Sequence, residues 1–251
     1  MENACIIGGL GIVGSNTAKL FGIEKIFDLR GSTITLKEAA KCRFCFIALP
    51  TNVDADGTYD TRDIEQIITQ IEQYGGAGIY IIRSTVWPGF ADHLMDILGI
   101  DRIISNPEFL TEATAWQDTK SPPFILLGGA QPNFTEQVKG IYETAVKGAN
   151  VILTDNKTAE LAKLAMNAYF STKVVFANEL YDAAQNIGAN YERVKQVLEA
   201  HPFGPRNHFT VNFKGRRGVQ GKCLPKDTKA FNHYVGARLT KKVMEINEGL
   251  K

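Results

Sequence analysis

The residues best suited to covalent chemistry lie around Cys223, in the stretch GVQGKCLPKD. Gly218 and Gly221 precede the cysteine, so the backbone there can approach a ligand closely. Two lysines flank it, and Pro225 predicts that a helix begins beside it. Nearby cations and the positive end of a helix dipole favour the thiolate, which is the nucleophilic form of cysteine. We therefore predict a reactive thiol here, although a single cysteine is more often a small buried apolar residue.

A second segment with chemical potential is the glycine-rich N-terminus. A short apolar run, ACII, predicts a strand, and Gly9, Gly11 and Gly14 then form the pattern GxGxxG in front of a predicted helix. These glycines allow a tight turn and a close approach of the backbone to a pyrophosphate. The helix N-terminus, at Ile12 and Val13, offers amide donors to the phosphates. The segment predicts a dinucleotide site.

Asp28 ends the second predicted strand, KIFDLR, about 20 residues after the first glycine of the pattern. An acid at that place accepts hydrogen bonds from the adenosine ribose hydroxyls, which favours NAD over NADP. Arg30, two residues later, is a side chain that tolerates a 2′-phosphate. We predict NAD as the cofactor; the alternative is a glycine turn followed by a solvated acid.

Apolar runs of strand length alternate with helical patterns in the first part of the chain. CFIALP, GIYIIRS, RIISN and PFILLGG read as strands, and DIEQIITQIEQY and FADHLMDILG read as helices. This alternation predicts an α/β fold, a Rossmann-like doubly wound parallel sheet with helices on both faces.

Polar residues follow these strands. Thr51 follows the third strand, Thr85 the next, and residues 106–112 a later one. The carboxyl ends of parallel strands form the edge at which open α/β sheets bind ligands, so we expect a site there. Each segment also has a simpler reading as a polar loop or a helix cap, and Asn106 with Pro107 is a good helix start.

The composition changes after residue 153. We predict a NAD-binding Rossmann-like domain over residues 1–153 and an all-α central and dimerisation domain with a long helix over residues 154–251. Residues 158–187 read as nearly uninterrupted helix that stops at Gly188. About 30 residues at 1.5 Å each give a rod of roughly 45 Å. Since one small domain does not need such a rod, a homodimer through this helix is expected.

The pattern of the long helix predicts which of its faces are covered. Leu161 and Phe176 are among the residues expected to pack on the sheet domain, which leaves Leu180 and Tyr181 for a partner helix. On the polar side, Lys163 and Asn167 are four residues apart and share one face, either as functional groups or as a solvated stripe.

Composition excludes several classes of partner. The 251 residues include 28 basic and 27 acidic side chains, so no excess charge predicts binding to nucleic acid or to a membrane. No apolar run has transmembrane length, and the N-terminus does not resemble a signal peptide. The four cysteines predict neither a disulfide framework nor a zinc site, so no metal is expected. The expected compartment is the cytoplasm.

Six phrases, in the same order, resemble the UDP-glucose and GDP-mannose 6-dehydrogenases, a family of NAD-dependent nucleotide-sugar dehydrogenases. They are GGLGIVG, ALPTN, RSTVWPG, NPEFLTEATAWQD, AELAKLAMNAYFSTKVVFANEL and GKCLPKDT, and together they cover most of the chain. The resemblance implies oxidation of the primary alcohol of a nucleotide sugar to a uronic acid, as in polysaccharide biosynthesis. Such an oxidation removes four electrons, so two NAD molecules are used in succession.

The resemblance also implies roles for single residues. Cys223 would attack a sugar aldehyde and carry a thioester, while Lys163 and Asn167 would bind and polarise the reacting carbon. Glu108 would act in acid–base steps, and Asp227 would assist the hydrolytic water. Thr85 and Glu112 would lie near the nicotinamide. The further residues implied to contact the substrate are Phe109, Leu110, Arg206, Gly218 and Gly221.

The chain departs from the family pattern in four places. The segment after Asp28 is short, Thr111 stands where a basic residue is common, and Gln220 replaces a glycine of the cysteine loop. The family's third domain, which holds the nucleotide, is expected to be absent. Two hypotheses follow: a short nucleotide-sugar dehydrogenase, or a non-catalytic NAD-binding dimeric module or subunit. In either case a separate chain could supply the nucleotide-binding domain.

Overall fold

The computed structural model describes residues 1–205 and 207–250 and divides into two compact units. The first unit consists of Met1–Asn52 and Tyr59–Lys163, and the second of Val53–Thr58 and the chain from Leu164 onward. The domain boundary at residue 153 stays a prediction.

The first unit contains a seven-stranded sheet in the order β2-β1-β3-β6-β7-β8-β9. The strands are β1 (Ala4–Ile7), β2 (Ile26–Phe27), β3 (Phe44–Ile47), β6 (Ile79–Ile82), β7 (Ile103–Ser105), β8 (Ile125–Gly129) and β9 (Val151–Thr154). Neighbours run parallel except β7 and β8, which pair antiparallel. The predicted Rossmann-like sheet is confirmed, with one reversal that the alternation of strands and helices did not indicate.

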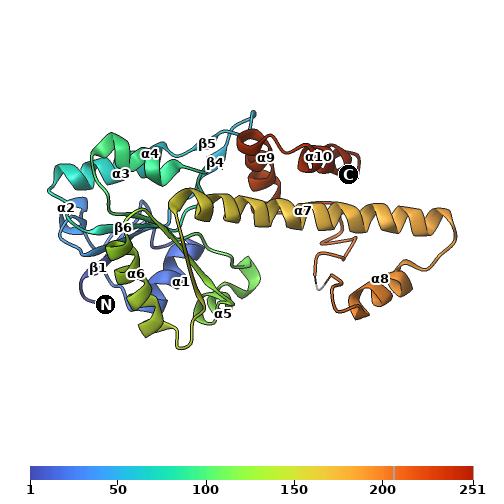
Figure 1. The fold of residues 1–251 in the computed structure, drawn as a ribbon, viewed down its shortest axis with the longest axis horizontal. Helices are drawn as coiled ribbons and strands as arrows, with labels where there is room; N and C mark the ends of the chain where they lie inside the picture. The colour runs from blue at the N-terminus through green and yellow to red at the C-terminus, as the bar shows by residue number, and fades with distance from the viewer. Residues whose placement is uncertain (206, 251) are drawn as a thin grey trace. The chain divides into compact units, whose positions relative to one another are not determined.

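Alternation along the central strands explains why helices cover both faces. In β6, Tyr80 and Ile82 enter one core together with α3 (Arg62–Gln73) and α4 (Phe90–Leu98). Ile79 and Ile81 enter the other core, which includes residues of α1 (Ile12–Phe21) and α6 (Pro132–Ala145). Figure 1 shows β1 and β6 of this sheet, with α3 and α4 on one side and α1 and α6 on the other. All four β6 side chains are almost completely buried. The remaining short elements of this unit are α2 (Leu36–Ala39), η1 (Glu112–Thr114) and α5 (Ala115–Lys120).

The second unit is mainly helical. It contains most of α7 (Asn156–Asn186), α8 (Tyr191–Ala200), α9 (Cys223–Val235) and α10 (Arg238–Gly249). A separate two-stranded sheet pairs β4 (Asn52–Val53) with β5 (Tyr59–Asp60). Gly188 has a φ of 71° just after α7, so the predicted glycine stop is confirmed. In the described residues, no helix combines the length and apolar character needed to cross a membrane.

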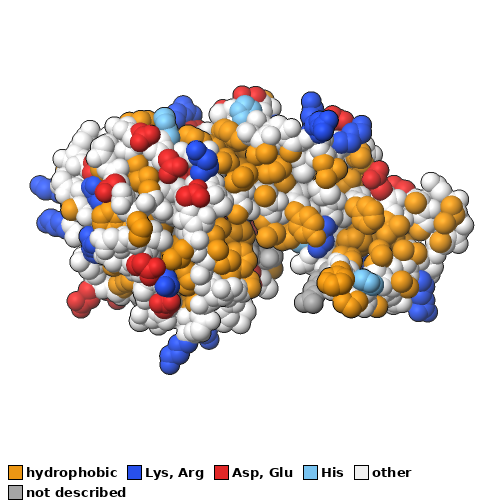
Figure 2. Space-filling view, viewed as in Figure 1, with side chains coloured by type: hydrophobic (Ala, Val, Ile, Leu, Met, Phe, Trp, Pro, Cys, Tyr) orange, Lys and Arg blue, Asp and Glu red, His pale blue; other side chains and the backbone are white. Residues whose placement is uncertain are grey.

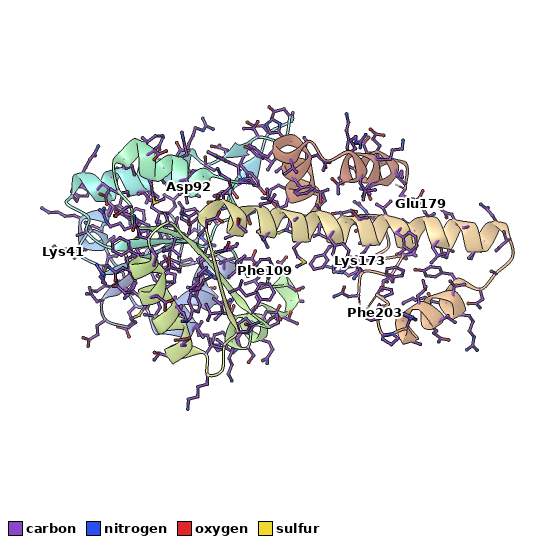
Figure 3. The ribbon with its side chains drawn as sticks, in the orientation of Figure 1. Lys41, Asp92, Phe109, Lys173, Glu179 and Phe203 are labelled. Atoms are coloured by element: carbon purple, nitrogen blue, oxygen red, sulfur yellow. The ribbon has the colours of Figure 1, made fainter. Side chains whose placement is uncertain are left out.

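The face assignment for α7 was wrong for two of the expected packing residues. Leu161 and Phe176 are 36% and 53% exposed, whereas Leu180 and Tyr181 pack against the cluster of Ala184, Tyr191 and Val211. The short helix α8 packs beside the end of α7 through Tyr191. It therefore covers Leu180 and Tyr181, which were expected to remain free for a partner helix. Figure 2 shows hydrophobic side chains on the surface along α7. Figure 3 labels Lys173 and Glu179 on the part of this helix that belongs to the second unit.

Candidate active site

The turn after β1 is built so that only glycine fits at its closest contacts. A Cβ on Gly14 would lie 2.1 Å from the carbonyl oxygen of Gly8, and a Cβ on Gly9 would lie 2.6 Å from the Ile26 side chain. Gly11 is less restricted, since its Cβ would lie 3.5 Å from that same oxygen of Gly8. Gly8 was not part of the predicted pattern, yet it has a φ of 79° and a Cβ there would lie 2.5 Å from the Ala48 carbonyl oxygen. The glycine doublet at the strand end is the sequence signal for it.

Helix α1 begins at Ile12, and its N-cap residue, Gly11, has no side chain with which to cap the first turn. The first amides of a helix have no partner within the helix, so those near Ile12 and Val13 remain available to an anion. The predicted phosphate-binding residues therefore lie where a pyrophosphate can accept hydrogen bonds from their backbone N–H groups.

Asp28 lies beside this turn and is strongly held. Its carboxylate accepts hydrogen bonds from the backbone N–H groups of Leu10 and Arg30, both at 3.0 Å. It also forms an ion pair with the Arg30 guanidinium, in which Arg30 Nε lies 3.1 Å from Asp28 Oδ1. The Arg30 hydrogen bond, with the backbone donors, lowers the pKa of Asp28 to about 2. The carboxylate is thus ionised at neutral pH, as a ribose acceptor must be.

The loops that follow β3 and β6 are tied to each other. Thr51 Oγ1 donates a 2.6 Å hydrogen bond to the carbonyl oxygen of Thr85, and Ser84 Oγ donates to the carbonyl oxygen of Leu49 at 2.8 Å. The structure therefore brings together Thr51 and Thr85, two predicted cofactor residues that are far apart in the sequence. This happens because β3 and β6 are parallel neighbours and end at the same edge.

A buried ion pair joins Lys163 of α7 to Glu108, in the loop after β7. Lys163 Nζ lies 3.1 Å from Glu108 Oε1, and the two side chains are only 6% and 13% exposed. The other Glu108 oxygen accepts from the backbone N–H of Leu110 at 2.7 Å, and Lys163 Nζ lies 5.3 Å from the centre of the Phe109 ring. Four of the predicted catalytic and substrate residues thus form one cluster.

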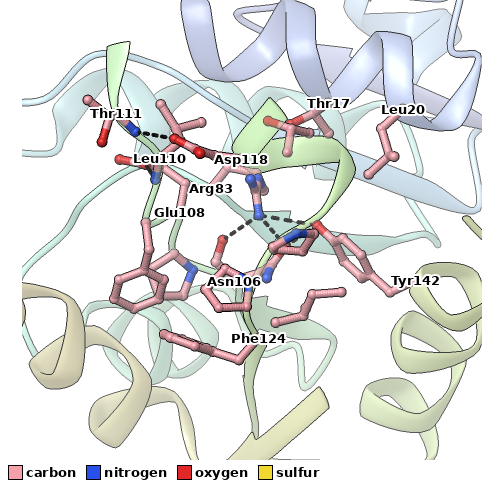
Figure 4. A pocket seen from close by; sticks show the side chains of 16 residues that line it. Thr17, Leu20, Arg83, Asn106, Glu108, Leu110, Thr111, Asp118, Phe124 and Tyr142 are labelled. Atoms are coloured by element: carbon pink, nitrogen blue, oxygen red, sulfur yellow. Dashed lines mark hydrogen bonds between the residues drawn. The ribbon is translucent and has the colours of Figure 1, made fainter. Parts of the chain in front are cut away.

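The loop after β7 also borders a cavity of about 210 Å³ in the first unit (Figure 4). Glu108, Phe109 and Leu110 line it, together with Arg83 and Tyr142. Buried Arg83 donates through Nη1 to the carbonyl oxygen of Asn106 at 3.2 Å and to Asn106 Oδ1 at 2.8 Å. The sequence pattern missed Arg83, which holds the start of the Glu108 loop.

Glu112 is a further predicted site residue of the first unit. It is exposed at the start of η1. Its place near the nicotinamide stays a prediction.

In the second unit, Asn167 and Asp227 form a buried pair. Asn167 Nδ2 donates to Asp227 Oδ2 at 2.6 Å, and Lys226 Nζ lies 2.6 Å from Asp227 Oδ1. Asn167 and Asp227 are 6% and 1% exposed. A carboxylate buried this deeply needs such donors, because leaving it without them would cost several kcal/mol (about 3–5).

Cys223 is the first residue of α9, so its thiol lies at a helix N-terminus as the sequence predicted. The side chain is exposed, and Asp227 follows one helical turn later on the same face. Gly218 and Gly221 have φ values of 77° and 83°, and a Cβ on Gly218 would lie 2.4 Å from Asn247 Oδ1. The loop before the cysteine therefore requires glycine at both positions. Arg206, a predicted substrate residue, lies outside the described residues.

Most of the predicted site residues thus fall into four groups: the dinucleotide turn with Asp28, the Thr51–Thr85 pair, the Glu108–Lys163 cluster, and the Asn167–Asp227 pair beside Cys223. Helix α7 carries Lys163 and Asn167 one turn apart. Such groups can polarise an oxygen, transfer a proton and supply a thiol nucleophile.

Two family models match the chain. The model described as the NAD binding domain of the UDP-glucose/GDP-mannose dehydrogenase family matches residues 20–146. The model of the central domain of the same family matches residues 157–249.

Curated relatives and solved structures are consistent with these matches. The UDP-glucose 6-dehydrogenase of Rickettsia felis is 28% identical over 232 residues, which are 88% of this chain and 51% of the relative. That of Streptococcus pneumoniae is 30% identical over 216 residues, which are 82% of this chain and 54% of the relative. The structure of a UDP-glucose dehydrogenase from Pyrobaculum islandicum has a TM-score of 0.86 at 24% identity and shares the fold over 99% of this chain and 68% of that one. This chain spans about half the length of these curated relatives.

Proposed function

Because the chain belongs to the UDP-glucose/GDP-mannose dehydrogenase family, we propose that it is an NAD-dependent nucleotide-sugar 6-dehydrogenase. It would convert the primary alcohol of a UDP-glucose-like substrate to the uronic acid through a thioester on Cys223. Its cofactor is NAD, since residues 20–146 match the family's NAD binding domain.

The residues of the first unit fit that cofactor. The close backbone contact at Gly14 and the uncapped first turn of α1 suit a pyrophosphate, and the ionised Asp28 suits ribose hydroxyls. When bound, NAD accepts the hydride of each oxidation. Thr51 and Thr85, tied together at the sheet edge, are proposed to line the nicotinamide side.

The first oxidation releases a hydride from the reacting carbon and a proton from its hydroxyl. We assign proton transfer to Glu108, which Lys163 holds in place. Lys163 also offers a positive charge to the developing oxyanion, and Asn167 offers an amide donor.

The second half of the reaction is assigned to the segment around Cys223. The thiolate adds to the aldehyde carbon, and the carbonyl oxygen takes up a proton to give a thiohemiacetal. Loss of a second hydride and of the hydroxyl proton leaves a thioester. Water then attacks the thioester and the thiol leaves as the carboxylate forms. Asp227 is one turn from Cys223 and is oriented by Asn167 and Lys226, so it is suited to orient that water.

The observation that carries the proposal is the buried Asn167–Asp227 pair one turn beyond an exposed helix-N-terminal thiol. The test is stoichiometry: incubation with UDP-glucose, GDP-mannose or a related sugar nucleotide should yield two NADH for each acid formed. One NADH per molecule of substrate consumed, with an aldehyde as the product, would rule out the thioester route. No turnover with any of these substrates, with or without a partner chain that supplies a nucleotide-binding domain, would favour the non-catalytic NAD-binding module.

The same proposal includes a homodimer through α7. Along this helix Tyr169 and Phe176 are 57% and 53% exposed, and Ile187, directly after its end, is 81% exposed. Large apolar side chains at this exposure on one long helix favour a second copy as the partner. We place the reaction in the cytoplasm, where reducing conditions preserve a nucleophilic thiol. Phe176→Glu should shift the sedimentation of the protein to that of a monomer; an unchanged dimer would refute the assignment of this helix.

A further inference from the structure

One buried carboxylate in the first unit belongs to none of the predicted roles. Glu160 lies on α7 three residues before Lys163 and is only 2% exposed. Its Oε2 accepts a 2.6 Å hydrogen bond from the backbone N–H of Gly89. Its Oε1 accepts from the backbone N–H of Ala91 at 3.0 Å and from Ser105 Oγ at 2.8 Å. The Glu160 side chain therefore connects α7 to two other segments of the chain.

The first of these segments is the N-terminus of α4. Gly89 is the N-cap of α4, and no side-chain cap comes from the helix itself. Two backbone donors that a helix leaves unpaired are thus satisfied by the carboxyl oxygens of Glu160, which lie at the positive end of the helix dipole. The residues directly before this cap are the loop after β6, which contains Thr85. Thr51 fixes one end of that loop through the Thr85 carbonyl, and Glu160 fixes the other.

The second segment is the end of β7. Ser105 is the last residue of that strand, and besides its bond to Glu160 it donates its backbone N–H to Asn156 Oδ1 at 3.0 Å. Three residues later the same loop presents Glu108 to Lys163. The position of Glu108 therefore depends on Glu160, which lies one turn before Lys163 on α7.

From these contacts we infer that Glu160 is a positioning residue for the proposed dehydrogenase reaction. It fixes the turn of α7 that carries Lys163 against the loops that carry Glu108 and Thr85. Thr85, Ser105, Glu160 and Lys163 also line one small cavity, which places these groups around a common space. Glu160 does not need to touch the substrate, since it acts through the residues that it holds.

Glu160→Gln tests this role, because the variant keeps the shape of the side chain but replaces one acceptor oxygen by an amide donor. The amide would face a backbone N–H or the Ser105 hydroxyl. The kinetic test of this inference rests on the proposed function. In Glu160→Gln we expect kcat for sugar-nucleotide oxidation to fall by about tenfold to a hundredfold, which is the effect of a small misplacement of catalytic groups. The KM for NAD should change much less than kcat.

The matched control is Glu72→Gln. The Glu72 carboxylate also joins separate elements of the first unit, accepting hydrogen bonds from Arg102 and Tyr80, but these contacts involve no proposed catalytic residue. This control should leave kcat unchanged. An equal loss of kcat in both variants would show a general structural effect and overturn the inference.

A second readout does not depend on turnover. The rate at which acetic anhydride modifies Lys163, mapped by mass spectrometry relative to exposed Lys222, should rise several-fold in Glu160→Gln and stay constant in Glu72→Gln. An unchanged Lys163 rate in the folded Glu160→Gln protein overturns the inference, even if the wild-type protein is an active dehydrogenase. If no sugar nucleotide is oxidised by the wild-type protein, the proposed function fails while the Lys163 rate still decides the role of Glu160. Should Glu160→Gln not fold, Ser105→Ala removes one of the three donors and should raise the Lys163 rate less.

Discussion

Replacing Asp28 by asparagine should weaken NAD binding by about thirtyfold. The size of this effect follows from the hydrogen bonds that its carboxylate makes. A carboxylate offers about four acceptor positions. In the structure they are used by the backbone N–H groups of Leu10 and Arg30 and by two nitrogens of the Arg30 side chain. Two ribose hydroxyls can therefore bind Asp28 only by displacing the Arg30 guanidinium.

That displacement costs little. The Arg30 side chain is 63% exposed, and solvent screens an ion pair at that exposure so strongly that it contributes little. Each ribose hydroxyl gains a hydrogen bond to a charged acceptor, which is worth about 1 kcal/mol more than one to a neutral amide. The loss in Asp28→Asn is then about 2 kcal/mol, or roughly thirtyfold in Kd. Arg30→Ala removes the competitor and should tighten NAD binding by up to about fivefold.

Titration calorimetry with NAD and NADP measures these effects. Asp60→Asn is the matched control, because Asp60 pairs with Arg62 in the same Asp-x-Arg arrangement, and Arg62 also lowers the pKa of Asp60 to about 2. Since the pKa of Asp28 is likewise about 2, its lowered value keeps the carboxylate ionised, and the difference between wild type and Asp28→Asn should be constant from pH 5 to 8. The reasoning is refuted if Asp28→Asn binds NAD as well as wild type does, or if wild type binds NADP equally well.

Three further perturbations address the remaining parts of the structure. Cys223→Ser should abolish acid formation while NAD binding persists, and full activity in an end-point assay would contradict the nucleophile assignment. Asn167→Ala removes a donor from buried Asp227 and should lower the free energy of unfolding by about 1.5–3 kcal/mol in urea titrations, whereas exposed Asn186→Ala should change it little. Burial raises the pKa of Glu160 to about 7, with Asp92 adding to it and the three hydrogen bonds opposing it. The folded state therefore binds the proton more tightly than the unfolded state, so the free energy of unfolding should fall as pH rises from about 4.5 to about 7 and then level off. Glu160→Gln should flatten that profile when unfolding is followed by the fluorescence of Trp87 and Trp116, and an unchanged slope would show that another group causes the pH dependence.

The parts of the fold that could be predicted from the sequence are those set by local pattern. The strand–glycine–helix unit, the position of Asp28, the alternation of strands and helices and the stop at Gly188 each depend on a few neighbouring residues. The resemblance to the nucleotide-sugar dehydrogenases also rested on contiguous phrases, and the family models confirm it.

The rest depends on partners far apart in the chain. Glu160 looks like a solvated helical acid until Gly89 and Ser105 are seen beside it. Arg83 reads as a strand-end cation, and only its bonds to Asn106 show that it supports the Glu108 loop. The faces of α7 were misjudged for a related reason, since a hydrophobic stripe does not reveal which element will cover it.

The continuity of α7 has a consequence for the proposed substrate site. Its 31 residues include neither glycine nor proline, so it offers no local point at which the backbone bends easily. Four residues of α-helix separate Lys163 from Asn167, which corresponds to a rise of about 6 Å. That interval cannot lengthen or shorten without breaking backbone hydrogen bonds. In the proposed reaction, the backbone positions of Lys163 and Asn167 would therefore stay fixed, and a larger sugar would have to be accommodated by rotation of side chains or by the surrounding loops.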